Sequence, residues 1–264
     1  MKKTTHGNML LLYIFFRPAI MVIGLTMALA AAGCDKKKEE VPVGAFARPT
    51  AENTARPPEK VAPPPPVKAL PKADAATPLS SYVKLEDGNQ LMFMYYALSG
   101  LPVDYEKIAG RYSREYQDTS DGFKRQDILT ALKPRIDGEI EKAKAGRYFI
   151  YTIGGAIKYT LNPYDFAGKS FPLNENIWSL DAQSYFNDNP SYKFSFTNGE
   201  EFKSLRVEDA EVARKIEGMI SGYKDAKLTI YAFAQDADPS KGLIKAQIVK
   251  MQFTDTKGKD LLVK

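Results

Sequence analysis

Apolar residues recur at helical spacing in the part of the chain that follows residue 80. The i, i+3, i+4, i+7 pattern of an amphipathic helix is present at Leu91, Met94, Tyr95 and Leu98. This helix is expected to end before Gly100, because glycine and the proline that follows are typical of helix ends. This segment is therefore predicted to be the first amphipathic helix of the folded part.

Two more helical patterns follow. The same periodicity continues at Tyr105, Ile108, Tyr112 and Tyr116. A third helix is expected after Asp121, a residue type that caps helices, with an apolar face at Leu129, Leu132, Ile136, Ile140 and Ala143. Pro134 interrupts this segment between Leu132 and Ile136, which indicates either a kink or two helices in succession.

Strand patterns replace helical ones after Gly146. Residues 148–160 are rich in β-branched and aromatic types and are broken by Gly154-Gly155, which predicts one bent strand or a hairpin. Residues 192–197 alternate between aromatic and polar types, and Asn198-Gly199 then predicts a hairpin turn leading into residues 202–207. Long strands are expected at 227–235 and 243–254, with a short edge at 261–263.

One further helix is expected among the strands. Its apolar face comprises Val212, Ile216, Met219 and Ile220, and Gly222 closes it. The order of elements predicts a single α+β domain over residues 80–264, helical at 88–145 and strand-rich at 146–264. Its N-terminal amphipathic helices are followed by a largely antiparallel sheet with one further helix.

Residues 1–33 have the composition of a secretory signal peptide. Lys2, Lys3 and Arg17 give a positive start without an acidic residue, and residues 19–32 form an apolar run of the usual length. The alternative is one membrane-spanning helix over residues 9–32. Arg17-Pro18 argues against it, because an arginine near the middle of a span costs roughly 2.5 to 3.5 kcal/mol and proline breaks the helix.

The end of this apolar run, Leu29-Ala30-Ala31-Ala32-Gly33-Cys34, resembles the lipobox of bacterial lipoproteins. The resemblance implies cleavage between Gly33 and Cys34 and acylation of Cys34, with chains such as palmitate, so that the protein is anchored to a bacterial membrane and faces the periplasm or the cell exterior. Asp35 resembles a signal for retention at the inner membrane. The alternatives for Cys34 are a buried small residue or a free thiol, and a free thiol is a liability in an oxidising compartment.

Residues 34–79 are predicted to be a disordered, proline-rich tether behind the lipidated cysteine. Ten of the 17 prolines lie between residues 35 and 78, with few large apolar residues among them. Fully extended, this segment reaches about 130 Å, and as a flexible coil it averages about 40 Å. A recognition ligand of the P-x-x-P kind is the alternative to a plain spacer.

Charge and side-chain inventory exclude several classes of function. The formal charge of +5 falls to +2 without the leader, and residues 80–264 carry 26 basic and 26 acidic residues, so nucleic-acid binding has no electrostatic support. The only histidine is His6 in the leader, and the only cysteine is Cys34. Histidine-dependent or cysteine-dependent catalysis, zinc sites, haem ligation and internal disulfides are therefore not expected after processing.

Acidic and aromatic segments are the remaining candidates for chemistry. Residues 236–240 alternate oxygen-bearing side chains, but the EF-hand spacing fails at Lys241 and Gln247, so a solvated loop is predicted. The paired carboxylates Glu200-Glu201 and Glu208-Asp209 are expected to be structural. Aromatics between residues 82 and 202 would line a groove for glycan or peptide if they are not core. Residues 162–166 and 171–173 would form a binding loop if they are not packed anchors.

The sequence thus favours a lipid-anchored, non-catalytic binding or accessory module of the cell envelope, whose partner is an envelope protein or the cell wall. No catalytic residue, cofactor or metal ligand is predicted. The alternatives are a carboxylate-dependent hydrolase acting on an envelope polysaccharide and an immunity or inhibitor-type lipoprotein.

Overall fold

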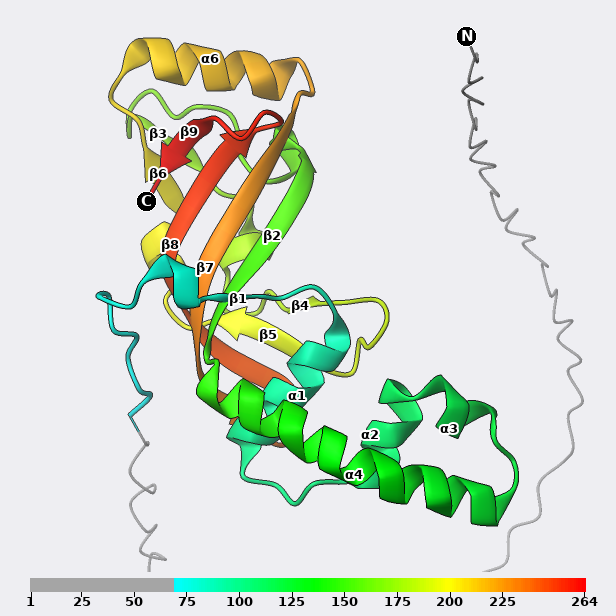
Figure 1. Ribbon diagram of the computed structural model, residues 1–264. Helices are drawn as coiled ribbons and strands as arrows, with labels where there is room; N and C mark the ends of the chain where they lie inside the picture. The colour runs from blue at the N-terminus through cyan, green and yellow to red at the C-terminus, as the bar shows by residue number, and fades with distance from the viewer. Residues whose placement is uncertain (1–68) are drawn as a thin grey trace, which may run out of the picture. The chain divides into compact units, whose positions relative to one another are not determined.

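The computed structural model describes residues 69–264 (Figure 1). Its α-helices in this range are α1 (Gly88–Ser99), α2 (Tyr105–Tyr112), α3 (Arg114–Asp118), α4 (Gly122–Ala145), α5 (Glu175–Trp178) and α6 (Ala210–Ser221). Short 3-10 turns occur at η1 (Leu79–Ser81), η2 (Ile157–Tyr159) and η3 (Gly199–Phe202). The strands are β1 (Val83–Lys84), β2 (Tyr148–Ala156), β3 (Ser170–Pro172), β4 (Ser184–Tyr185), β5 (Lys193–Phe196), β6 (Ser204–Arg206), β7 (Asp225–Asp238), β8 (Leu243–Asp255) and β9 (Asp260–Val263).

Seven of these strands form one sheet in the order β1-β2-β7-β8-β5-β4, with β9 also paired with β8. The long pairings of β7 with β2 and with β8 are antiparallel, whereas the short pairings β1–β2 and β5–β8 are parallel. The expected mixture of helices with a mostly antiparallel sheet is confirmed. The two remaining strands, β3 and β6, form a separate antiparallel pair.

One face of the sheet carries the core. Phe149, Ile230, Ala246 and Phe194 come from four different strands and are almost completely buried. Helix α1 packs on β5, β7 and β8 and is itself covered by α4. Its first turn is fixed by a capping box, in which the Asp87 side chain accepts the backbone N–H of Gln90.

The opposite face of the sheet is covered by the segment that precedes α1. Gln235 on β7 donates to the carbonyl of Pro71, and the Ala73 backbone N–H donates to Gln247 on β8. The ring of Tyr82 packs edge-on against Tyr148 and Tyr231. Residues ahead of the expected boundary at residue 80 are therefore packed on the sheet.

Several local expectations were wrong. Asn198-Gly199 does not form a hairpin turn, because β5 pairs with β4 and β8 while β6 pairs with β3. Two open alternatives were also resolved. Pro134 does not separate two helices, because α4 is continuous across it. The single strand predicted as one alternative within residues 148–160 is confirmed, and it covers residues 148–156. Two helices lie among the strands where one was expected, because α5 is a single turn that is too short to display helical periodicity.

A cluster of tyrosines between α1 and the start of β5 is expected to make the free energy of unfolding depend on pH in the alkaline range. Burial raises the pKa of Tyr95, Tyr96 and Tyr192 above the ordinary value. In the unfolded chain the tyrosine hydroxyls lose their protons near pH 10, whereas the folded protein retains them to higher pH. The buried tyrosines therefore contribute fully to stability below pH 10, and this contribution is lost as pH rises further. We expect Tyr192→Phe to make the decline above pH 10 shallower by up to about 1.4 kcal/mol per pH unit.

Denaturant unfolding between pH 8 and 11.5 measures this effect, with Tyr185→Phe at an exposed position of β4 as the control. Equal slopes in the wild type and in Tyr192→Phe would contradict the linkage.

Candidate functional site

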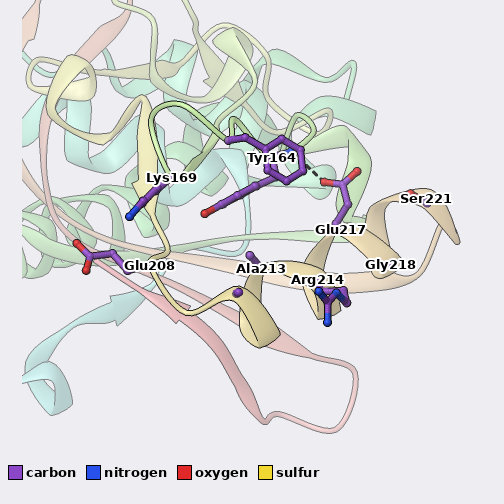
Figure 2. Close-up of a pocket in the computed structure, with 10 residues that line it drawn as sticks. Tyr164, Lys169, Glu208, Ala213, Arg214, Glu217, Gly218 and Ser221 are labelled. Carbon is purple, nitrogen blue, oxygen red and sulfur yellow. Dashed lines mark hydrogen bonds between the residues drawn. The ribbon is translucent and has the colours of Figure 1, made fainter.

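An open groove of about 640 Å³ lies beside α6 (Figure 2). We call it the α6 groove. The helix contributes Ala210, Ala213, Arg214, Glu217, Gly218 and Ser221. The facing wall comes from a loop that carries Tyr164, Phe166 and Lys169, and Glu208 lies just before the helix.

The loop wall is a tight turn held by its own backbone. Asp165 and Ser170 exchange two backbone hydrogen bonds of 2.8 and 3.2 Å, which confines residues 166–169 to the tip. Lys169 has a positive φ of 47°, and its carbonyl accepts the backbone N–H of Val207 at 2.8 Å. The turn therefore projects Phe166 into solvent, where its side chain is 83% exposed.

Tyr164 connects this wall to the helix. Its hydroxyl donates to the Val207 carbonyl at 2.8 Å, and its backbone N–H donates to Oε2 of Glu217 at 2.9 Å. Its ring packs on buried Phe171 and meets Phe166 edge-on at a centroid distance of 5.1 Å. Tyr164 is therefore held in place from both sides before any ligand arrives.

The groove exists because α6 presents small side chains on this side. Ala210, Ala213, Gly218 and Ser221 fall on one helical face, whereas Ile216 lies on another face and is buried in the core. The helix begins at Asp209, whose carboxylate accepts the backbone N–H groups of the first turn. Short side chains along the helix leave the space between helix and loop unfilled.

Two acidic and two basic side chains line the groove, and they differ in their partners. Glu208 forms an ion pair of 2.8 Å with Arg206, and Glu217 accepts the Tyr164 N–H. Lys169 and Arg214 form no ion pair or side-chain hydrogen bond with other described residues. The groove thus combines an exposed aromatic ring, an apolar helix face and two cations that are available to a ligand.

The acidic pairs that the sequence singled out have structural contacts. Glu200 pairs with Lys203 at 3.1 Å, and Asp209 caps α6. In the loop between β7 and β8, Asp238 accepts both the hydroxyl and the backbone N–H of Ser240, and these bonds lower the pKa of the Asp238 carboxyl. Within residues 69–264, no cluster of three or more acidic, histidine or cysteine side chains is placed to hold a metal ion.

The predicted lipid attachment at Cys34 and the cleavage site between Gly33 and Cys34 lie outside the described residues. Among residues 69–264, no helix has the length and apolar character needed to cross a membrane. Lipidation therefore stays a prediction from the sequence.

Sequence reasoning identified only one wall of the α6 groove. Residues 162–166 were left as either a binding loop or packed anchors, and the structure places Tyr164 and Phe166 at the groove. The helix wall was missed because its alanines, glycine and serine carry no chemical signal in a sequence. Comparison of the chain with protein-family models, curated proteins and solved structures finds no match.

Proposed function

We propose that this protein is a lipid-anchored protein of the bacterial envelope whose domain binds an envelope protein or the cell wall through the α6 groove. The observation that supports binding at the groove is the exposed ring of Phe166, 83% accessible, beside an apolar helix face. Lys169 and Arg214 add two cations that form no ion pair with another residue in the range 69–264. Aromatic and arginine side chains that a partner buries at the centre of an interface are among the groups that most often dominate binding energy. The resemblance of residues 29–34 to a lipobox supports the anchor, because it implies acylation of Cys34 ahead of the domain.

A crosslinking experiment in cells tests the groove. We expect Phe166→Ala to lower the yield of the crosslinked partner by roughly tenfold, because a buried aromatic anchor contributes about 1.5 to 3 kcal/mol to binding. Phe123→Ala is the matched control, since Phe123 is 90% exposed on α4 and does not line the groove. Equal loss in both variants, or no loss in either, would remove the groove from the proposal.

Replacement of the predicted acylation site tests the anchor. Cys34→Ser removes the thiol that acylation requires, so we expect the acylated, cleaved species to disappear. Membrane association then falls to that of an uncleaved or soluble chain, because two or three acyl chains account for stable anchoring. Intact mass and membrane fractionation measure the result. An unchanged mass with full membrane retention would instead favour a membrane-spanning helix over residues 9–32.

A carboxylate-dependent hydrolase of envelope polysaccharide is the second candidate, because Glu208 and Glu217 line the same aromatic-walled groove. Glycoside hydrolysis uses two carboxylates, one of which must exchange protons with the substrate. Both carboxylates here are occupied by internal partners, which favours the binding module. Release of soluble fragments from purified cell wall, abolished by Glu217→Gln, would reverse this preference.

A further inference from the structure

The sheet ends beside α6 in three short connections. The register places Ala156 opposite Asp225, and Ala226 opposite Asp255, so β2, β7 and β8 reach the same row. Beyond this row the chain continues through residues 157–159, 222–224 and 256–259. Figure 1 shows these ends of β2, β7 and β8 together at the α6 end of the sheet. We call residues 154–159, 222–227 and 254–259 the sheet tip.

The sheet tip is strongly basic in a domain that is neutral overall. Its five lysines are Lys158, Lys224, Lys227, Lys257 and Lys259, and its only acids are Asp225 and Asp255. No described residue forms an ion pair with any of these lysines. The Asp255 carboxylate accepts the backbone N–H groups of Lys257 and Lys259, so this acid holds the turn that presents two of the lysines.

Two exposed tyrosines stand among these lysines. Tyr159 is 66% exposed and Tyr223 is 65% exposed. The ammonium of Lys158 lies 4.9 Å from the ring centroid of Tyr159 and 3.5 Å from that of Tyr223. Tyr223 has a positive φ of 53°, a conformation that normally selects glycine or asparagine, and its ring nevertheless projects into solvent.

We propose that the sheet tip docks on the surface of an anionic phospholipid bilayer. Lysines that project from short turns reach lipid phosphates, and their long side chains allow the ammonium groups to stay at the headgroup level. Tyrosine is enriched at the same depth because its ring is apolar and its hydroxyl is polar. This contact is separate from acylation and from the α6 groove, and it supplies a second, weaker attachment of the domain.

The position of the incoming chain allows such docking. Pro71 and Ala73 are bonded near the opposite end of the sheet, beside Gln235 and Gln247. The nine residues of β2 span about 30 Å between the two ends. A segment from Cys34 to Leu70 extends to about 110 Å, so a cysteine held in the membrane leaves ample chain for the sheet tip to reach the same surface.

Vesicle co-sedimentation tests the proposal on a chain that starts at residue 34 and carries Cys34→Ser, so that no acyl anchor masks the contact. The probe is a phosphatidylcholine vesicle with about 30 mol% phosphatidylglycerol, compared with phosphatidylcholine alone. We expect binding to the anionic vesicles only, weakened by high salt. Lys257→Gln combined with Lys259→Gln lowers the affinity roughly 25-fold, since each lysine near an anionic surface contributes a factor of roughly five.

Two further comparisons decide between a bilayer and other polyanions. Lys107→Gln combined with Lys124→Gln removes the same charge from exposed sites on α2 and α4 and leaves the affinity unchanged. Tyr159→Ser combined with Tyr223→Asn lowers the affinity roughly tenfold, and asparagine tolerates the positive φ. An equal loss of vesicle affinity in the control pair overturns the proposal. It is also overturned if the protein binds heparin as tightly as vesicles and the tyrosine substitutions leave the heparin affinity unchanged.

Discussion

Asn198→Ala is expected to lower the free energy of unfolding by about 2 to 4 kcal/mol. The Asn198 side chain stands where a neighbouring strand would otherwise pair with β8. Its Nδ2 donates to the Ile248 carbonyl at 3.0 Å, and its Oδ1 accepts the Ile248 N–H at 2.8 Å. Ile248 is only 2% exposed, so alanine leaves a buried donor and a buried acceptor without partners.

The effect is measured by denaturant unfolding at pH 7. Asn162→Ala is the control, because this exposed amide makes one long bond of 3.5 Å to the Leu173 carbonyl, and we expect a loss below about 1 kcal/mol. Asn198→Asp places a carboxylate oxygen against the Ile248 carbonyl, so its loss is at least as large at pH 7 and diminishes when the carboxyl is protonated. A loss at Asn198 no larger than at Asn162 would refute the strand-mimicking role.

Asn198 also illustrates why strand pairing was harder to predict than strand position. The dipeptide Asn198-Gly199 matches a hairpin turn, but a turn of that type needs positive φ at both residues, and Asn198 has a φ of −116°. The amide instead bonds to β8, which lies 50 residues further along the chain. Local patterns specify turn types, and they hold no information about a partner at that separation.

The patterns succeeded where one element buries one face. The spacing of Val212, Ile216 and Ile220 predicted a helix, and α6 spans Ala210–Ser221 with Ile216 and Ile220 buried. The long strands expected at 227–235 and 243–254 are likewise present as β7 and β8, the two longest of the described strands. Burial of one face imposes a period that can be read directly.

The patterns failed for the outward side of the same helix. The α6 groove depends on the small side-chain volume at Ala210, Ala213 and Gly218. Small residues on a solvent-facing side of a helix produce no periodic pattern and carry no reactive group that a sequence analysis could recognise. Only the aromatic residues of the opposing loop were visible as candidates. The loop wall of the groove could therefore be predicted and the helix wall could not. A cavity forms between two surfaces, and the residues of these two surfaces lie far apart in the sequence.

Ser221 lines the α6 groove, and Tyr223 of the sheet tip follows it by two residues. If the sheet tip rests on a bilayer, the end of the groove that contains Ser221 lies next to the membrane surface. The proposed partner would then be bound close to the membrane, although the predicted tether by itself would allow the domain to stand far from it. Loss of vesicle binding in the lysine variants with unchanged crosslinking at the groove would separate the two attachments.

Gly199→Ala is expected to be as damaging as the loss of its neighbour Asn198. Gly199 is buried at the start of η3, where the chain passes against the end of α5. A Cβ atom at this position would lie 1.8 Å from the Trp178 carbonyl oxygen and 2.7 Å from the Trp178 carbonyl carbon. Both atoms belong to the backbone, so relief requires α5 and η3 to separate.

We expect Gly199→Ala to lower the free energy of unfolding by about 3 kcal/mol or more, at the upper end of the range for overpacked sites. Gly138→Ala is the matched control, since a Cβ there meets no atom within 4 Å and alanine is favoured over glycine inside α4 by about 0.5 to 1 kcal/mol. The two substitutions should therefore shift the denaturation midpoint in opposite directions. A Gly199→Ala protein as stable as the wild type would mean that α5 does not press against η3 in solution.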